Sequence, residues 1–173
     1  MADNDTQYVP ELSDDLSETD FDRLTGVITD GFIGAIGGLV GTAVMSVVLV
    51  VAASLGAFEI NQFASFASLF GADFLLPNNP TAIGYGAFLI GGMVFWPLML
   101  ASLGAYLPGE KYATKGLSFG FVLWTGFAPA FYTGFGGLAL ALYLLLTLIG
   151  HFAYGFTLGS VFDYFSTRPS TLV

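Results

Sequence analysis

The residue with the clearest capacity for chemistry is His151, the only histidine in the sequence. It lies within residues 116–162, a long segment without any charged side chain. An ionisable residue inside such an apolar segment is costly in a membrane and usually has a role. Thr147 and Tyr154 fall on the same face, because residues three and four apart are neighbours on a helix. We identify these three residues as the intramembrane polar group of the chain.

Four roles are open to His151. It could ligate haem or a metal, but a second histidine is missing and the remaining soft ligands are methionines such as Met45. It could relay protons, although no acidic residue lies at the same depth. It could contact a lipid or a quinone. We favour the fourth role, a neutral imidazole that hydrogen-bonds a neighbouring helix. The sequence therefore predicts no catalytic residues, no metal site, no cofactor and no enzymatic activity.

The composition indicates a lipid-facing protein. Of the 173 residues, 55% are hydrophobic and 10% are charged, and there is no cysteine. Soluble domains carry roughly 25% charged residues, so this chain cannot cover a water-facing surface. The net charge is −9, and eight of the thirteen acidic residues lie before position 23. This acidity disfavours nucleic acid as a partner, and with so few lysines it favours a halophilic source.

The hydropathy pattern predicts an all-α polytopic membrane protein, a four-helix transmembrane bundle with one interfacial amphipathic helix. A span needs about 20 apolar residues. We expect Thr29 or Asp30 to cap the first span, Pro97 to kink the second and Pro129 to bend the third. The expected segments are a disordered acidic tail (1–25), a transmembrane domain (26–165) with spans at about 30–57, 81–107, 112–133 and 138–162, an interfacial helix at about 58–74, and a C-terminal tail (166–173).

The basic residues give the orientation. Four spans place every lysine and arginine on one side of the membrane, namely Arg23, Lys111, Lys115 and Arg168. The opposite side then holds only Glu59 and Asp73. Because basic residues near span ends stay in the cytoplasm, both termini are predicted to be cytoplasmic and the protein to lie in the cell membrane.

Glycines mark the expected helix contacts, since small residues let helix backbones approach closely in lipid. These helix-packing positions are Gly34, Gly37, Gly38, Gly41, Gly116, Gly120, Gly155 and Gly159. All of them fall in the cytoplasmic half, so the bundle should be tight there and open toward the outer leaflet. A lipid tail, a partner helix or the Phe-rich segment 58–74 would fill the open end. Trp96 and Trp124 are interpreted as interfacial anchors.

Four motifs carry a resemblance to a known family: GLVGTAVMS at 38–46, LPG at 107–109, GLSFGFVLW at 116–124 and HFAYGFTLG at 151–159. Over residues 26–165 the chain resembles an uncharacterised family of small four-span membrane proteins of haloarchaea and bacteria. Some members are encoded near haem–copper oxidase genes, which implies an accessory respiratory subunit. Members usually carry a second histidine at the start of span two, which this chain lacks.

Two functions remain as expectations. The first is a non-catalytic accessory or assembly subunit of a larger membrane complex, such as a respiratory terminal oxidase. It rests on the small size, the glycine-lined faces and the lack of a catalytic residue set. The alternative is a small homo-oligomeric transporter or channel, which helices broken at Pro97 and Pro129 would suit. In either case the expected partners are membrane lipids and a membrane protein or further copies of this chain.

Overall fold

The computed structural model describes residues 12–69 and 71–166. Within these ranges every regular element is a helix and no strand occurs, as the composition predicted. The elements in order are α1 (Leu12–Ser54), α2 (Gln62–Leu69), η1 (Asp73–Leu75), α3 (Pro80–Ile90), η2 (Gly91–Phe95), α4 (Trp96–Leu103), η3 (Gly104–Tyr106), α5 (Tyr112–Ala130) and α6 (Gly137–Ser166).

The beginning of α1 differs from the prediction. The helix is continuous from Leu12 to Ser54, so Thr29 and Asp30 are helical and cap no helix start. Residues 12–25, which we expected to be disordered, are helical too, and residues 1–11 lie outside the described part. Extending an existing helix adds a hydrogen bond for each residue fixed, without a new nucleation cost. The chain divides into two compact units, residues 1–30 and 31–173, and the second unit holds the apolar part of α1 together with every later helix.

Three helical segments in the described ranges are long and apolar enough to cross a membrane. They are Gly31–Ser54, Pro80–Tyr106 and Gly137–Phe165, which lie close to three of the four predicted spans. The remaining predicted span, the third at about 112–133, corresponds to α5, which is not among them. Its 19 residues include Lys115 and three threonine or serine side chains, and these lower its apolar character. By length and composition, three helical segments could therefore cross a membrane.

The second of these segments is interrupted at its middle. α3 passes into a π-helical turn, η2, before α4 begins at Trp96, and Pro97 is the next residue. Proline has no backbone N–H and cannot close an α-helical hydrogen bond. A π turn of this kind is rare and frequently lies at a functional site. The predicted irregularity at Pro97 is therefore present, as a change of helix type.

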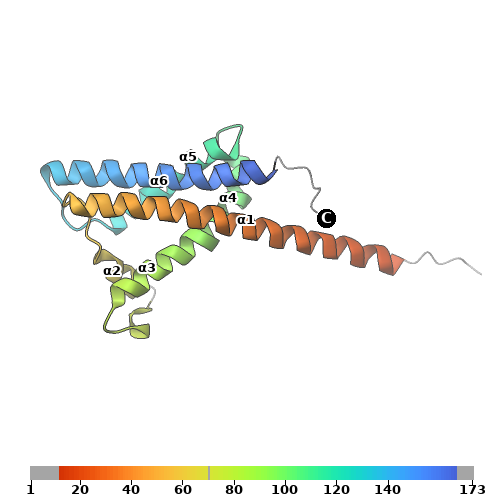
Figure 1. Cartoon of the computed structure of the whole chain (residues 1–173), viewed down its shortest axis with the longest axis horizontal. Coiled ribbons are helices and arrows are strands. Elements are labelled where there is room, and N and C mark those ends of the chain that lie inside the picture. The colour runs from red at the N-terminus through yellow and green to blue at the C-terminus, as the bar shows by residue number, and fades with distance from the viewer. Residues whose placement is uncertain (1–11, 70, 167–173) are drawn as a thin grey trace, which may run out of the picture. The chain divides into compact units, whose positions relative to one another are not determined.

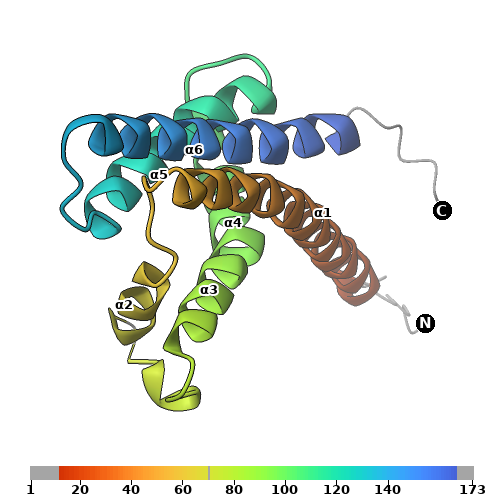
Figure 2. The ribbon, with the colours of Figure 1, turned by 60° about the vertical axis from the view of Figure 1, so that its left-hand side comes forward.

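The two ends of the bundle are each joined by polar contacts. At one end the Asp163 carboxylate accepts hydrogen bonds from the first backbone N–H groups of α5, those of Tyr112 (2.8 Å) and Ala113 (2.9 Å). At the other end Thr133 donates to Glu59 Oε1 at 3.2 Å. α5 therefore packs antiparallel to α6, and α3 diverges from α6 with α2 at its side (Figures 1 and 2).

The Phe-rich segment after α1 folds back onto the bundle. Phe63 of α2 is buried, and its ring lies 5.3 Å from that of Phe88 and 5.2 Å from that of Phe131. A Cβ at Gly84 would collide with the Phe63 carbonyl, so this glycine lets α3 approach α2. Leu69, the last residue of α2, is 74% exposed. Part of the apolar face of the predicted helix at 58–74 is thus buried by aromatic packing within the protein.

Candidate functional site

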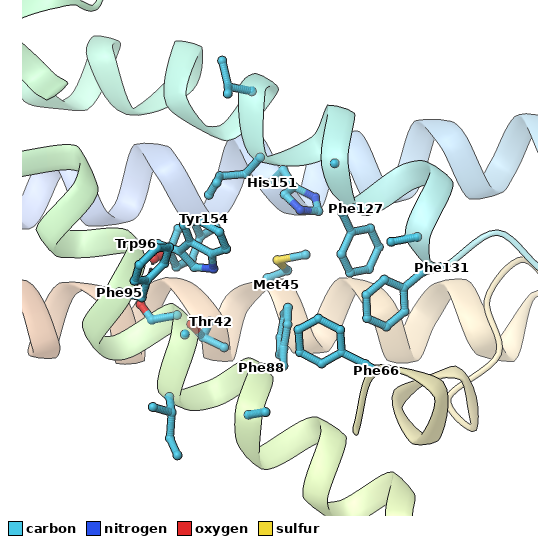
Figure 3. A pocket seen from close by; sticks show the side chains of 18 residues that line it. Thr42, Met45, Phe66, Phe88, Phe95, Trp96, Phe127, Phe131, His151 and Tyr154 are labelled. Carbon is cyan, nitrogen blue, oxygen red and sulfur yellow. Dashed lines mark hydrogen bonds between the residues drawn. The ribbon is translucent and has the colours of Figure 1, made fainter. Parts of the chain in front are cut away.

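An apolar cavity of about 660 Å³ lies beside the interrupted helix. Aromatic rings form much of its wall, and its two titratable side chains are those of His151 and Tyr154. Figure 3 shows the lining side chains, which come from α1, α2, α3, η2, α4, α5 and α6. They belong to Thr42, Met45, Phe66, Ala87, Phe88, Ile90, Gly91, Gly92, Phe95, Trp96, Val122, Leu123, Gly126, Phe127, Ala130, Phe131, His151 and Tyr154.

His151 is only 3% exposed, and the hydrogen bond of its ring indicates the tautomer. Its Nδ1 lies 2.7 Å from the carbonyl oxygen of Thr147, one turn earlier in α6. A carbonyl oxygen only accepts hydrogen bonds, so Nδ1 carries the proton and donates it. In an apolar surrounding the neutral ring is favoured over the charged one. The Nε2 atom then presents a lone pair, and no group in the described ranges hydrogen-bonds it.

This geometry corrects the role that we favoured for His151. Its hydrogen bond goes to its own helix, whereas we expected a bond to a neighbouring helix. The ring meets another helix by an apolar contact, because the Phe127 ring of α5 lies edge-on at 4.8 Å between centroids. The Thr147 carbonyl thus fixes the ring, and Nε2 is left to face the cavity.

Thr147 and Tyr154 each take part in a hydrogen bond between helices at the cavity side of α6. The indole Nε1 of Trp124 in α5 donates to Thr147 Oγ1 at 3.0 Å, and this hydroxyl donates in turn to the Tyr143 carbonyl at 2.6 Å. The Tyr154 hydroxyl donates to the Gly92 carbonyl at 2.8 Å. The three residues of the predicted polar group of α6 therefore have different partners. Thr147 is hydrogen-bonded to α5, Tyr154 is hydrogen-bonded to η2, and His151 lines the cavity.

The bond from Tyr154 compensates for the proline. In the π turn the Trp96 N–H donates to the Gly91 carbonyl, five residues earlier. The Gly92 carbonyl would next require the N–H of residue 97, which is a proline and has none. An unpaired carbonyl in an apolar region costs several kcal/mol by order of magnitude. The phenol of Tyr154 supplies the missing donor and ties α6 to the break.

Trp96 brings a second unpaired polar atom to the cavity. Its indole is half-buried, and a Cβ at Gly91 would lie 3.5 Å from its Nε1, so the absence of a side chain at Gly91 gives the indole room. No described residue accepts a hydrogen bond from this N–H, which is therefore accessible, since no buried side-chain nitrogen of the described residues lacks a partner. From the sequence we interpreted Trp96 and Trp124 as interfacial anchors. In the structure Trp96 lines the cavity and the indole of Trp124 donates to Thr147 of α6.

The glycines of α5 and α6 lie in close helix contact. A Cβ at Gly116 would collide with the Gly155 carbonyl, and one at Gly155 with the Gly116 carbonyl. Similarly, Gly120 faces the His151 carbonyl and Gly159 faces that of Tyr112. The structure therefore brings these four predicted positions together along one α5–α6 seam.

The predicted glycines of α1 also face neighbours within the chain. A Cβ at Gly38 would collide with the Gly92 carbonyl and lie 2.8 Å from Pro97 Cγ. At Gly41 it would lie 2.9 Å from the Tyr154 ring, at Gly37 3.0 Å from Leu158 Cδ1 and at Gly34 3.1 Å from Pro97 Cβ. All four positions are thus occupied by contacts within the bundle rather than left open on its surface.

Several cavity residues were not singled out from the sequence. In the sequence nothing distinguishes Phe88, Phe127 and Gly126 from other apolar or small helix residues, because the spacing of a cavity wall is the same as that of a packed core. The combination of Gly91–Gly92 with Pro97 was a usable signal, because a proline following paired glycines predicts a loosened turn. Within the ranges that the structure describes, no three acidic or histidine side chains come together as a metal site would require.

Comparison with known proteins gives one relationship. No curated protein and no solved structure matches the chain. A family described as a family of unknown function (DUF6789) matches residues 28–173, which is all of the chain after the acidic segment and the start of α1. The uncharacterised character of the family agrees with the resemblance noted in the sequence. The protein is a member of this family of unknown function, DUF6789.

Proposed function

We propose that this protein is a four-span membrane protein that binds a lipid-soluble molecule inside the bilayer and serves as a non-catalytic accessory subunit of a larger membrane complex. The observation that carries the proposal is the cavity of about 660 Å³ between α1, α3, η2, α5 and α6. Ligand sites are typically concave, apolar and furnished with a few polar groups. This cavity has that character, with one imidazole and one indole N–H.

The cavity is open toward the surroundings between α3 and α5. Three of its lining residues are largely exposed, Ile90 at 65%, Phe95 at 55% and Val122 at 57%. In a membrane these residues face acyl chains. A molecule dissolved in the bilayer can therefore enter sideways without crossing water.

We assign α5 as a further span, the third of four along the chain, because it lies along α6 over its length, with the glycine seam between them. A helix packed in this way must lie at the same depth as its neighbour. Lys111 and Lys115 are then at the end of the bundle where α6 ends, and the positive-inside rule places this end in the cytoplasm of the cell membrane. Epitope tags at both termini, tested for protease access in sealed inside-out and right-side-out vesicles, would report this topology.

We infer the accessory role from the length of the chain and from the few side chains in it that could take part in catalysis. A chain of 173 residues with one histidine and no cysteine offers little material for catalysis. We expect the tagged protein, purified from native membranes in mild detergent, to carry other membrane proteins in fixed ratio, such as subunits of a respiratory terminal oxidase. Recovery of the protein alone under conditions that preserve known complexes would contradict this role.

Filling the cavity should abolish binding without unfolding the protein. Gly126 lines the cavity, and a Cβ there would meet nothing within 4 Å. We expect Gly126→Leu to remove the binding of lipid-soluble molecules and to leave stability unchanged or raised, because leucine favours a helix over glycine by about 1 kcal/mol. Mass spectrometry of molecules co-purified with the protein measures the loss.

Gly86 provides the matched control. It is also a helical glycine with open space at its Cβ position, but it does not line the cavity. Gly86→Leu should retain the bound molecule at the level of the unmodified protein. Equal retention by the two leucine variants, or the absence of any molecule above the level of bulk lipid, would contradict the proposed function.

A small homo-oligomeric transporter is the alternative, and the π turn favours it. Transporter sites commonly form where a membrane helix is broken near its middle, and here the break at η2 borders the cavity. Solute flux in proteoliposomes that disappeared in Gly126→Leu but not in Gly86→Leu would put this alternative first.

A further inference from the structure

We propose that the molecule bound in the cavity is a hydroquinone with an apolar tail, held by its ring hydroxyls between His151 and Trp96. The inference rests on the proposed function, that the cavity takes a lipid-soluble molecule. It adds the chemical class of the head group, which follows from the two polar atoms that the cavity wall leaves without partners.

His151 requires a donor. Its Nδ1 proton is held by the Thr147 carbonyl at 2.7 Å, so Nε2 is a pure acceptor in the neutral ring. His151 as a whole is only 3% exposed, but no buried side-chain nitrogen or oxygen of the described residues lacks a hydrogen-bond partner. Nε2, which has no partner, is therefore accessible, and His151 lines the cavity, where a bound hydroxyl can donate to this atom. A hydroxyl group satisfies this atom. A ketone, an ester carbonyl or an alkyl chain does not.

Trp96 requires an acceptor. The indole N–H is a donor only, and it lies over Gly91 in the cavity wall. The two side chains stand on different helices, α4 and α6, and border the same space (Figure 3). A ring with two hydroxyls can place one oxygen at each side chain, the first donating to His151 and the second accepting from Trp96.

The aromatic side chains in the cavity wall indicate that the head group of the bound molecule is a ring. Phe127 and Phe131 stack at 4.2 Å between centroids, and Phe88 lies 6.4 Å from Phe127. Aromatic rings prefer the offset-stacked and edge-to-face contacts that such surfaces offer. An apolar tail can leave through the opening at Ile90 and Val122 into the lipid. A dihydroxybenzene or dihydroxynaphthalene ring with a tail therefore meets the acceptor, the donor, the aromatic wall and the lateral opening together.

The test compares three probes of nearly equal shape on the full chain in lipid nanodiscs under anaerobic conditions. They are a decyl-substituted benzohydroquinone, the matching quinone and the dimethyl ether of the hydroquinone. Only the first can donate to Nε2. We expect it to bind about tenfold more tightly than the ether, since one hydrogen bond of about 1–1.5 kcal/mol corresponds to such a factor. Hexadecanol, which has one hydroxyl and no ring, should bind more weakly than the hydroquinone.

Variants assign the two contacts. His151→Phe should bind the hydroquinone and the ether equally, and His151→Gln, which keeps an acceptor, should restore part of the preference. Trp96→Phe should weaken binding of hydroquinone and quinone alike, because both offer an oxygen acceptor. Trp124→Phe is the control, since Trp124 bonds Thr147 and does not line the cavity.

The possible outcomes distinguish a failure of the hydroquinone proposal from a failure of the proposed function, the binding of a lipid-soluble molecule. Equal binding of hydroquinone and ether, a preference that survives His151→Phe, or tighter binding of hexadecanol would overturn the hydroquinone and leave an apolar site. A Soret band in the absorbance of the purified protein would overturn it in favour of haem ligated by Nε2. Failure of every probe to bind, with Gly126→Leu and the unmodified protein alike, would remove the cavity function itself.

Discussion

Replacing Gly155 with alanine is expected to lower the free energy of unfolding by about 1–3 kcal/mol, the usual cost of overpacking a close contact. The added Cβ would collide with the Gly116 carbonyl and lie 3.2 Å from the Gly120 backbone nitrogen. These obstacles are backbone atoms of α5, so no rotamer change can relieve them and the two helices must separate. Unfolding in mixed micelles of increasing dodecyl sulfate fraction, followed by circular dichroism, measures the loss.

Gly150→Ala is the matched control on the same helix. A Cβ there would lie 3.5 Å from Met45 Cγ and 3.6 Å from Val48 Cβ, which are ordinary contact distances. This variant should keep or slightly raise stability, because alanine is the better helix former. If Gly155→Ala and Gly150→Ala unfold at the same dodecyl sulfate fraction, α5 and α6 are not packed through this seam.

Tyr154→Phe is expected to cost about 1–3 kcal/mol, because it leaves the Gly92 carbonyl without a donor in an apolar region. The change removes one oxygen and preserves the ring, so packing losses are small. The same unfolding assay measures the effect. Tyr132→Phe is the comparison, since that hydroxyl bonds the Phe135 carbonyl in an exposed turn where water can replace it.

A double-mutant cycle with Pro97→Ala tests the reason for this cost. Alanine at position 97 restores a backbone N–H that the Gly92 carbonyl can accept. In that background Tyr154→Phe should lose at least half of its effect, and the coupling between the two substitutions gives the energy of the shared carbonyl. Independent, additive effects would show that Tyr154 does not compensate for the proline.

Much of the helical architecture could be read from the sequence because lipid imposes simple rules. Long apolar segments predicted the helical ranges of α3 to α6 within a few residues, and the break at Pro97 was predicted from its missing N–H. The start of α1 could not be predicted in the same way. Acidic residues in water are compatible both with a disordered tail and with the extension of a nucleated helix, and local composition does not distinguish these outcomes.

The cavity was beyond sequence reasoning for a different reason. His151 was conspicuous as the only histidine, but the direction of its free nitrogen depends on the Thr147 carbonyl, a backbone group that the sequence does not distinguish from any other. Phe127 and Phe88 have the side chains of ordinary core residues, and only the divergence of α3 leaves space between them. The shape of the site arises from helix directions, which residue types constrain weakly.

The π turn at Gly91–Phe95 behaves like a single residue inserted into an otherwise regular helix. Each residue advances an α-helix by about 100°, so deleting one residue here would restore regular winding and rotate all of α4 by that angle. Trp96 would then leave the cavity and Pro97 would leave the notch formed by Gly34 and Gly38. The length of this short stretch, more than the identity of any one of its side chains, sets the relative orientation of the two halves of the segment.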